Sequence, residues 1–474
     1  MDSNNFYTCL KTSFPFTPTI KQNIGLQKLS NFIFSTLTND IFVLKGYAGT
    51  GKTTIISVLV KNLWHAQKTA VLLAPTGRAA KVISNYSKSE AFTIHKKIYV
   101  PRAEKNGKIS FVLAPNKHKK TLFIVDEASM ISDISNQAKL FGSGSLLDDL
   151  IQFVYSGSQC KLLLIGDTAQ LPPVKLDLSP ALNESNLELN YNKEVIRLEL
   201  DEVVRQGEDS GILFNATHLR EAVSNSYFDS FHFNLNGFKD IVRLNDGYEI
   251  LDAINDAYST LGSEDTALIV RSNKRANLYN EQIRSRILFN ENELTAGDFL
   301  MIVKNNYFWL KPTSEAGFIA NGEIIEVLEI FSIKELYEFR FAEVKIRMVD
   351  YPKMRPFETV LMLDTIKLET PSLPYEESNK LYQEILKDFE DESSSYKKFL
   401  GVKKSKYLNS LQVKFSYAIT CHKSQGGQWD TVFVEQPYLP NGIDRDYLRW
   451  LYTAITRAKE KLYLIGFKDD FFED

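Results

Sequence analysis

Residues 46–54 read GYAGTGKTT, and this stretch decides the fold. An apolar run at 41–44 precedes it, and a helical pattern over 54–67 follows it. A glycine-rich turn between a buried strand and a helix is the setting of a P-loop, whose backbone N–H groups hold phosphate oxygens. The chemistry predicts that Lys52 reaches the β- and γ-phosphates and that Thr53 binds Mg²⁺. The full set predicted to bind nucleotide here is Gly49, Thr50, Gly51, Lys52, Thr53 and Thr54.

Three further apolar runs end, like the first, in polar or glycine-bearing segments. The runs 70–74, 122–125 and 162–165 are followed by PTGRAA, DEAS and GDTAQ, respectively. Open α/β sheets bind ligands at the carboxyl ends of their strands. The first third of the chain is therefore predicted to form a parallel sheet, covered by helices on both faces, with its functional groups at one edge.

The acidic pair Asp126-Glu127 directly follows one of these strands. A strand-terminal Asp-Glu is unremarkable alone, but beside a P-loop it places Asp126 to hold Mg²⁺ and Glu127 to polarise the attacking water. Because phosphoryl transfer needs electrostatic stabilisation, we expect further cations near the γ-phosphate. The candidates are Arg205 and Arg457, although an arginine taken alone is more often in a surface salt bridge.

The last third of the chain repeats the α/β pattern. Apolar runs at 267–270, 413–417, 431–434 and 462–465 alternate with helical patterns at 273–286 and 445–459. Between them lies a stretch of alternating β-type sequence followed by an acidic, lysine-rich tract. We interpret this stretch as an inserted β module with an amphipathic helix packed on it.

These patterns divide the chain into four parts. The first lobe comprises 1–95 and 121–195, and a basic hairpin at 96–120 is inserted in it. The second lobe comprises 196–293 and 411–474, and the β module with its helical extension occupies 294–410.

Composition limits the alternatives. With 474 residues, 44% hydrophobic and 24% charged, the chain is neither disordered nor of low complexity. A net charge of −3 gives no global basic field, so a polyanion would have to bind local patches. Three cysteines without CxxC spacing argue against a disulfide framework or a zinc site. No signal sequence or membrane span is apparent, and we expect a cytoplasmic protein, nucleoid-associated if bacterial, without a membrane partner.

Eight segments together resemble the ordered motifs of superfamily 1 helicases. They are GYAGTGKTT, LLAPTGRAA, TIHK, IVDEAS, IGDTAQLPPV, VVRQ, CHKSQGGQWD and YTAITRA. The GDxxQLPPV and HKSQG forms are most similar to the RecD-like and Dda-like branch, which moves 5′ to 3′ on single-stranded DNA. The resemblance implies two RecA-like P-loop lobes, and it implies that the inserted module is a small barrel like the Src-homology-3 fold.

The resemblance also implies roles for individual residues around ATP. Gln22 is similar to the glutamine that reads the adenine edge, and Gln170 to the one that senses the γ-phosphate. Arg205 and Arg457 would act as arginine fingers from the second lobe. Gln428 departs from the family pattern, in which a glutamate commonly contacts the nucleotide sugar, but an amide can still bind a hydroxyl.

DNA-binding residues are implied in the same way, and their types suit contacts to phosphates and bases. Taken alone, either histidine would more often be structural. The set comprises Thr76, Arg78, His95, Thr420, His422 and Lys423.

The segment between TIHK and IVDEAS is unusually basic, with eight lysines and arginines against Glu104. It contains Asn106-Gly107, a strong hairpin signal. We predict a β-hairpin that separates the strands, with Tyr99 or Phe111 available to stack on a base at the fork. The alternative interpretation is an ordinary surface hairpin whose lysines keep the chain soluble.

Two functions remain open at this point. The first is an ATP-dependent DNA helicase, acting as a monomer on single-stranded DNA and forked duplex, with ATP and Mg²⁺. The second is a DNA-stimulated ATPase that remodels protein–DNA complexes without separating strands, which would have no need of a pin. A P-loop kinase is disfavoured, because one lobe would suffice for it. Direction follows only from the resemblance, and the residues do not distinguish DNA from RNA.

Overall fold

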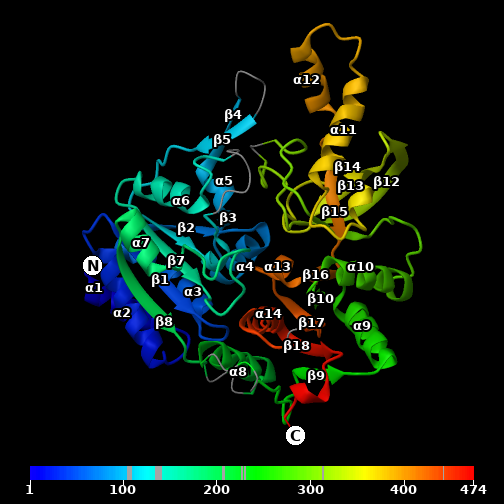
Figure 1. The fold of residues 1–474 in the computed structure, drawn as a ribbon. Helices are drawn as coiled ribbons and strands as arrows, with labels where there is room; N and C mark the ends of the chain where they lie inside the picture. The colour runs from blue at the N-terminus through cyan, green and yellow to red at the C-terminus, as the bar shows by residue number, and fades with distance from the viewer. Residues whose placement is uncertain are drawn as a thin grey trace.

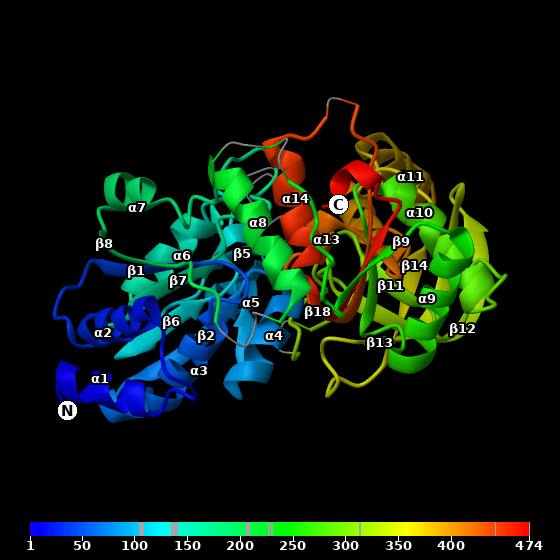
Figure 2. The ribbon, with the colours of Figure 1, turned by 90° about the horizontal axis from the view of Figure 1, so that it is seen from below.

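The computed structural model describes residues 1–103, 109–133, 141–204, 209–225, 228, 231–311, 314–440 and 442–473. Two α/β lobes lie side by side, and a barrel with a protruding helical extension belongs to the second (Figure 1). Seen from below, α14 (Arg445–Ile455) lies where the two lobes meet (Figure 2). None of the helices in the described ranges is long and apolar enough to cross a membrane.

The first lobe is built on a parallel sheet with the strand order β3-β2-β6-β7-β1-β8. Its strands are β1 (Asp40–Gly46), β2 (Thr69–Ala74), β3 (Ala91–Thr93), β6 (Thr121–Val125), β7 (Lys161–Gly166) and β8 (Glu194–Leu200). Its helices are α1 (Ser3–Thr12), α2 (Ile20–Phe34), α3 (Lys52–Asn62), α4 (Gly77–Ser87), α5 (Ile94–Ile98), α6 (Leu146–Tyr155) and α7 (Glu184–Tyr191). The predicted parallel sheet is confirmed.

Strand β1 shows how the sheet is covered on both faces. Phe42 and Leu44 pack in a core with residues of α1, α2 and α3, whereas Ile41 and Val43 pack in a second core with residues of α5 and α6. Because both faces are buried, the strand reads as a continuous apolar run. Because these strands are parallel, the segments that follow β1, β6 and β7 all lie at the same edge of the sheet.

The second lobe has a parallel sheet with the order β16-β10-β17-β18-β9. Its strands are β9 (Ile241–Leu244), β10 (Thr266–Val270), β16 (Ala418–Thr420), β17 (Trp429–Glu435) and β18 (Ala458–Ile465). Its helices are α8 (Gly211–Asn225), α9 (Gly247–Leu261), α10 (Asn273–Gln282) with a π-helical turn (Ile283–Ile287), α13 (Cys421–Ser424) and α14. Two RecA-like lobes are thus present.

The inserted module is a closed barrel, β11-β12-β13-β14-β15, as the resemblance implied. Its strands are β11 (Phe299–Ile302), β12 (Ile324–Leu336), β13 (Phe339–Met348), β14 (Phe357–Met362) and β15 (Leu411–Phe415). Two helices, α11 (Tyr375–Lys387) and α12 (Ser395–Lys404), project from it (Figure 1). Leu381 and Ile385 of α11 are buried against Phe341 and Val360 of the barrel, so this helix is amphipathic as predicted.

The basic segment of the first lobe forms a hairpin of β4 (Tyr99–Ala103) and β5 (Ile109–Leu113). The strands are antiparallel, with Tyr99 opposite Leu113 and Ala103 opposite Ile109. The predicted Asn106-Gly107 turn lies outside the described residues.

The structure corrects three predicted boundaries. Strand β8 pairs with β1 from Glu194 to Leu200, so the first sheet continues past 195. The run 413–417 does not form a strand of the second sheet: residues 413–415 belong to β15, which closes the barrel against β11, and the second sheet begins again only at β16. Helix α14 ends at Ile455, because the chain turns there into β18. A short apolar run does not encode which strand it will pair with, so the sheet that each run joins could not be predicted from the sequence.

Candidate active site

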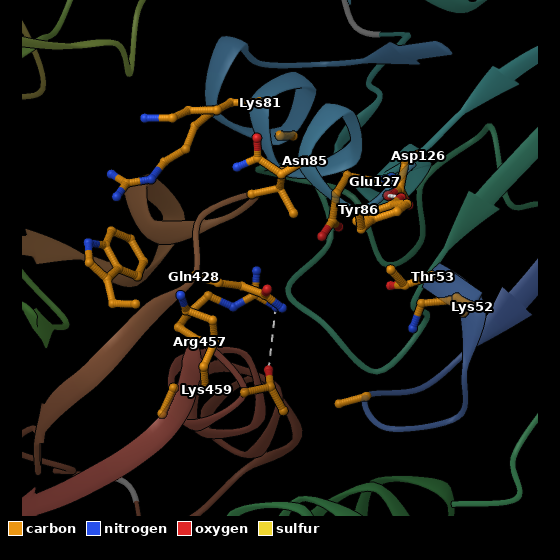
Figure 3. A pocket seen from close by; sticks show the side chains of 18 of the residues that line it. Lys52, Thr53, Lys81, Asn85, Tyr86, Asp126, Glu127, Gln428, Arg457 and Lys459 are labelled. Carbon is orange, nitrogen blue, oxygen red and sulfur yellow. Dashed lines mark hydrogen bonds between the residues drawn. The ribbon is translucent and has the colours of Figure 1, made fainter. Parts of the chain in front are cut away.

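A cavity of about 790 Å³ lies between the two lobes. The first lobe lines it with the P-loop, one face of α4 and the residues after β6. The second lobe lines it with Gln428, Arg457 and Lys459, which lie across the cavity from Lys52 and Thr53 (Figure 3). Neither lobe alone forms this site.

The P-loop is shaped by glycines at its tightest points. Gly49 and Gly51 have φ of +73° and +86°, a left-handed conformation that favours glycine. A Cβ on Gly51 would lie 2.5 Å from Nε2 of Gln22. Helix α3 begins immediately afterwards, and within the described part of the chain no side chain caps its first N–H groups. These free donors at a helix N-terminus fit the phosphates of a nucleotide.

Lys52 is held at the centre of this loop. Its Nζ donates to the carbonyl oxygens of Gly46 and Tyr47, at 2.6 and 2.7 Å. The ammonium is thereby fixed beside the uncapped N–H groups, where the β- and γ-phosphates are expected.

Asp126 and Glu127 enter the cavity from the end of β6. One Asp126 oxygen accepts from the backbone N–H of Glu127 at 2.9 Å, and the other accepts from the Tyr86 hydroxyl at 2.6 Å. Burial raises the pKa of both carboxyls, while the Lys52 ammonium lowers that of Asp126 and the Arg457 guanidinium lowers that of Glu127. Two adjacent carboxylates in such a site suit a hard divalent cation, so the donor set fits Mg²⁺ with Thr53.

Glu127 has φ of +53°, which is unusual for a residue with a side chain. Such backbone strain is retained where the surrounding structure fixes it, and it clusters at functional sites. Here it directs the carboxylate toward the second lobe (Figure 3).

Gln22 lies at the other end of the P-loop. Its side chain completes a capping box with Thr19 at the start of α2, and its Nε2 donates to the carbonyl oxygen of Thr50 at 3.0 Å. Phe14 and Phe16 line the same end of the cavity, and Phe16 is 46% exposed. The amide and an aromatic surface together suit a nucleotide base.

The second lobe presents Arg457 to this site. Its guanidinium is held by the carbonyl oxygens of Thr453 and Gly427, at 3.0 and 3.4 Å, and the residue is 3% exposed. Gln170 of the first lobe is also buried, and its Oε1 has no hydrogen-bond partner in the described part of the chain. An orphaned polar atom in the cavity wall is consistent with a contact that only a bound ligand supplies.

Comparisons with known proteins also divide the chain into a first and a second α/β part. A family model described as an AAA domain matches residues 32–231, and one described as a UvrD-like helicase C-terminal domain matches 415–465. The ATP-dependent DNA helicase dda of Enterobacteria phage T4 is 25% identical, covering 89% of this chain and 93% of its own length. The RecBCD enzyme subunit RecD of Buchnera aphidicola subsp. Schizaphis graminum is 25% identical over 96% of this chain and 74% of its own. The uncharacterized protein R530 of Acanthamoeba polyphaga mimivirus is 23% identical over 93% of this chain and 98% of its own.

The site and these comparisons support an ATP-dependent DNA helicase of superfamily 1, similar to the RecD-, Dda- and Pif1-like proteins. Among the predicted active-site residues of this helicase, only Arg205 lies outside the described residues. The others line the cavity or the P-loop beside it.

The predicted DNA-binding residues fall into separate groups in this helicase. Thr420 precedes α13, which carries His422 and Lys423, and the Lys423 ammonium contacts Oδ1 of Asn321 in the barrel module. Burial lowers the pKa of His422, and burial together with Lys414 lowers that of Lys423 to about 8. These side chains place polar and cationic groups where the second lobe meets the barrel.

Thr76 and Arg78 lie at the start of α4. The Thr76 hydroxyl caps the helix by accepting from the N–H of Ala79 at 3.2 Å. The Arg78 guanidinium lies 4.0 Å from the centre of the Trp429 ring and lines the nucleotide cavity. The structure therefore places Arg78 in the cleft between the lobes, apart from His95 and the hairpin.

His95, Tyr99 and Phe111 belong to an aromatic cluster between the hairpin and the barrel. We define this aromatic cluster as His95, Tyr99, Phe111, Phe141, Tyr307 and Phe318. Phe111 stacks on Phe141 at 4.7 Å and meets Tyr307 of the barrel module at 4.9 Å. Burial lowers the pKa of His95 to about 4, so its ring is neutral at physiological pH.

The expectation that Tyr99 is available to stack on a base is wrong. Tyr99 is 7% exposed, and its hydroxyl donates to Oδ2 of Asp149 at 2.6 Å. Its ring packs against Phe141 at 5.0 Å. The residue anchors the base of the hairpin to α6, because a buried phenol needs an acceptor.

Sequence reasoning missed Tyr86 and Tyr452, whose hydroxyls reach Asp126 and Asp167. Tyr452 stands five positions before Arg457 within YTAITRA, and Tyr86 lies on the helix that begins within PTGRAA. Their closeness to these motifs in the sequence was the signal that could have drawn attention to both tyrosines. Their hydrogen-bond partners, however, come from distant segments of the chain.

Proposed function

We propose that this helicase moves along single-stranded DNA from 5′ to 3′ and separates duplex, driven by ATP-dependent closure of the two lobes. The observation that carries the proposal is the shared cavity, in which Glu127 of one lobe faces Arg457 of the other. Because the site is complete only when both lobes contribute, nucleotide binding favours their approach and hydrolysis releases it. The direction rests on the likeness to the RecD- and Dda-like branch.

Hydrolysis is assigned to the residues in the cavity. Lys52 and the N–H groups of α3 bind and orient the phosphates, and Glu127 orients the water and accepts its proton. Arg457 neutralises the charge that develops on the transferred phosphoryl group. Asp126 and Thr53 would hold Mg²⁺, which would supply neutralisation of phosphate charge when bound.

Closure would be transmitted through contacts that already join the lobes near the P-loop. The Thr453 hydroxyl accepts from the N–H of Leu171 at 2.8 Å, and Gln425 Nε2 donates to the carbonyl oxygen of Leu171 at 2.7 Å. Leu171 directly follows Gln170. A change at the γ-phosphate can therefore reach α13 and α14 through one short segment.

Strand separation is assigned to the hairpin of β4 and β5. Its Phe111 is braced by Tyr307 of the barrel module, so the hairpin is supported from both lobes. A separating element must resist the force of the duplex, and a braced hairpin suits this better than a free surface loop. This support favours the helicase over the remodelling ATPase. We also propose that single-stranded and forked DNA are the substrates and that one copy of the chain suffices.

Strand separation on two matched duplexes tests the proposal, one with a 5′ single-stranded tail and the other with a 3′ tail. We expect ATP-dependent opening of the 5′-tailed duplex alone, and none by Lys52→Ala. Opening from the 3′ tail would contradict the direction. DNA-stimulated hydrolysis with neither duplex opened would replace the helicase by the remodelling ATPase.

A further inference from the structure

We propose that Tyr86 is a positioning residue that orients Asp126 for Mg²⁺ and links the metal site to the contacts at the far end of α4. The inference rests on the proposed function, because it assumes that Asp126 holds Mg²⁺. It concerns a side chain that neither the motifs nor the comparisons single out.

Tyr86 and the backbone of Glu127 together hold the Asp126 carboxylate. The Tyr86 hydroxyl donates to Oδ2 of Asp126 at 2.6 Å, and the N–H of Glu127 donates to Oδ1 at 2.9 Å. Both oxygens of Asp126 are thus fixed, and each keeps lone pairs for the metal or a metal-bound water. Figure 3 shows Tyr86 beside Asp126 and Glu127 on the α4 side of the cavity. A partner that orients a metal-binding carboxylate in this way tunes the affinity for the metal.

Tyr86 also contacts α3 through its backbone. It lies in the last turn of α4, and its carbonyl oxygen accepts from the Ser57 hydroxyl of α3 at 3.2 Å. Helix α3 carries Thr53, the other expected Mg²⁺ ligand. Tyr86 therefore lies between the two elements that would hold the metal, but it is its hydroxyl, and not this backbone contact, that reaches a metal-binding side chain.

The opposite end of α4 meets the second lobe and the barrel. A Cβ on Gly426 would lie 3.1 Å from the Thr76 hydroxyl, and one on Gly77 would lie 3.0 Å from a carboxylate oxygen of Glu323. Arg78 packs on Trp429. These close approaches leave little free space, so a shift of the second lobe or the barrel must move the start of α4.

Helix α4 itself joins these two ends. Helix α4 has 11 residues and is continuous from Gly77 to Ser87, so a displacement at its start reaches Tyr86 as a movement of a rigid element. Thr76 belongs to the predicted DNA-binding set. DNA at that end of α4 would therefore change the affinity for Mg²⁺ at Asp126, and Mg²⁺ would change the affinity for DNA by the same factor.

Tyr86→Phe tests the inference because it removes only the hydroxyl. The measurement is binding of a non-hydrolysable ATP analogue as a function of Mg²⁺ concentration, with and without a single-stranded oligonucleotide. We expect the half-saturating Mg²⁺ concentration of the variant to rise about tenfold and to lose its response to the oligonucleotide. The wild-type chain should show that response.

Two controls separate positioning from packing. Ser57→Ala loosens the same helix end without touching Asp126, and Tyr258→Phe removes a buried hydroxyl for which the described residues offer no partner. Both should keep the wild-type Mg²⁺ dependence. An equal rise in Ser57→Ala would indicate a structural role and overturn the inference, as would a Tyr86→Phe variant that no longer binds the oligonucleotide without nucleotide.

Failure of the inference can be told from failure of the proposed function. If the wild-type chain opens a 5′-tailed duplex but Tyr86→Phe keeps its Mg²⁺ dependence and its response to the oligonucleotide, only the inference is overturned. If the wild-type chain shows no DNA-stimulated hydrolysis, the proposed function fails, and the role assigned to Tyr86 fails with it.

Discussion

The hydroxyl of Tyr452, in the second lobe, donates a 2.6 Å hydrogen bond to Oδ2 of Asp167 in the first. The same hydroxyl accepts from the N–H of Ala48 in the P-loop at 2.9 Å. Tyr452 is 1% exposed, so both bonds are shielded from water. One side chain thus ties the nucleotide-binding loop to the helix that leads to Arg457.

Tyr452→Phe should loosen this tie. Phenylalanine keeps the ring but leaves the Asp167 oxygen and the Ala48 N–H without their partner, which costs about 1–3 kcal/mol of folding stability. We expect a lower Tm and a several-fold lower kcat for DNA-stimulated hydrolysis. Thermal unfolding and steady-state kinetics measure the two effects, and an unchanged kcat would show that the contact does not serve hydrolysis.

Glu127→Gln should separate binding from hydrolysis. The amide has nearly the same shape as the carboxylate but cannot accept the proton of the attacking water. We expect kcat to fall by about 10²–10⁴-fold while affinity for the nucleotide stays within a few-fold of wild type. Single-turnover hydrolysis and equilibrium binding of ATP check this, and near-normal turnover would remove Glu127 from the mechanism.

Lys423 predicts a pH dependence of DNA binding. Its pKa is lowered to about 8 by burial and by the nearby Lys414 ammonium, so the charge that would attract a phosphate is lost as the pH rises through that value. We expect the affinity for single-stranded DNA to fall between pH 7 and pH 9. Lys423→Arg keeps its charge over this range and should remove most of the change.

Phe111→Ala should uncouple hydrolysis from strand separation. It removes the ring that joins the hairpin to Tyr307 of the barrel module, so the hairpin loses its support. We expect the unwinding rate to fall markedly, with DNA-stimulated hydrolysis retained. Val100→Ala is a matched control, because Val100 lies on the same hairpin and is 40% exposed. Equal losses in both variants would contradict the specific role of Phe111.

The ATP side of the site could be predicted from the sequence because its parts are local. A P-loop carries its strand, turn and helix within one short segment, and Asp126-Glu127 follows its own strand directly. Partners from distant segments could not be predicted. The hydroxyl of Tyr86 reaches Asp126 across 40 positions of sequence, and Tyr452 reaches Ala48 across 404.

The aromatic Tyr99 and the cationic Arg78 also have contacts that the sequence could not predict. Tyr99 has the right chemistry to stack on a base, but it is buried against Phe141 and Asp149, and this burial depends on the tertiary packing. Arg78 has the right chemistry for a phosphate, and its contact with Trp429 of the other lobe could not be predicted from residue type. Residue type fixes what a side chain can do, whereas its neighbours in space decide what it does.

The most direct test of the two-lobe mechanism is the rate of DNA-stimulated ATP hydrolysis by Arg457→Ala. Arg457 belongs to the second lobe and faces Glu127 of the first, so it contributes only if both lobes act on one nucleotide. We expect a fall in kcat of about 10³-fold or more, with single-stranded DNA still bound in the absence of nucleotide. Near-normal hydrolysis by a folded Arg457→Ala variant would contradict a site shared between the lobes.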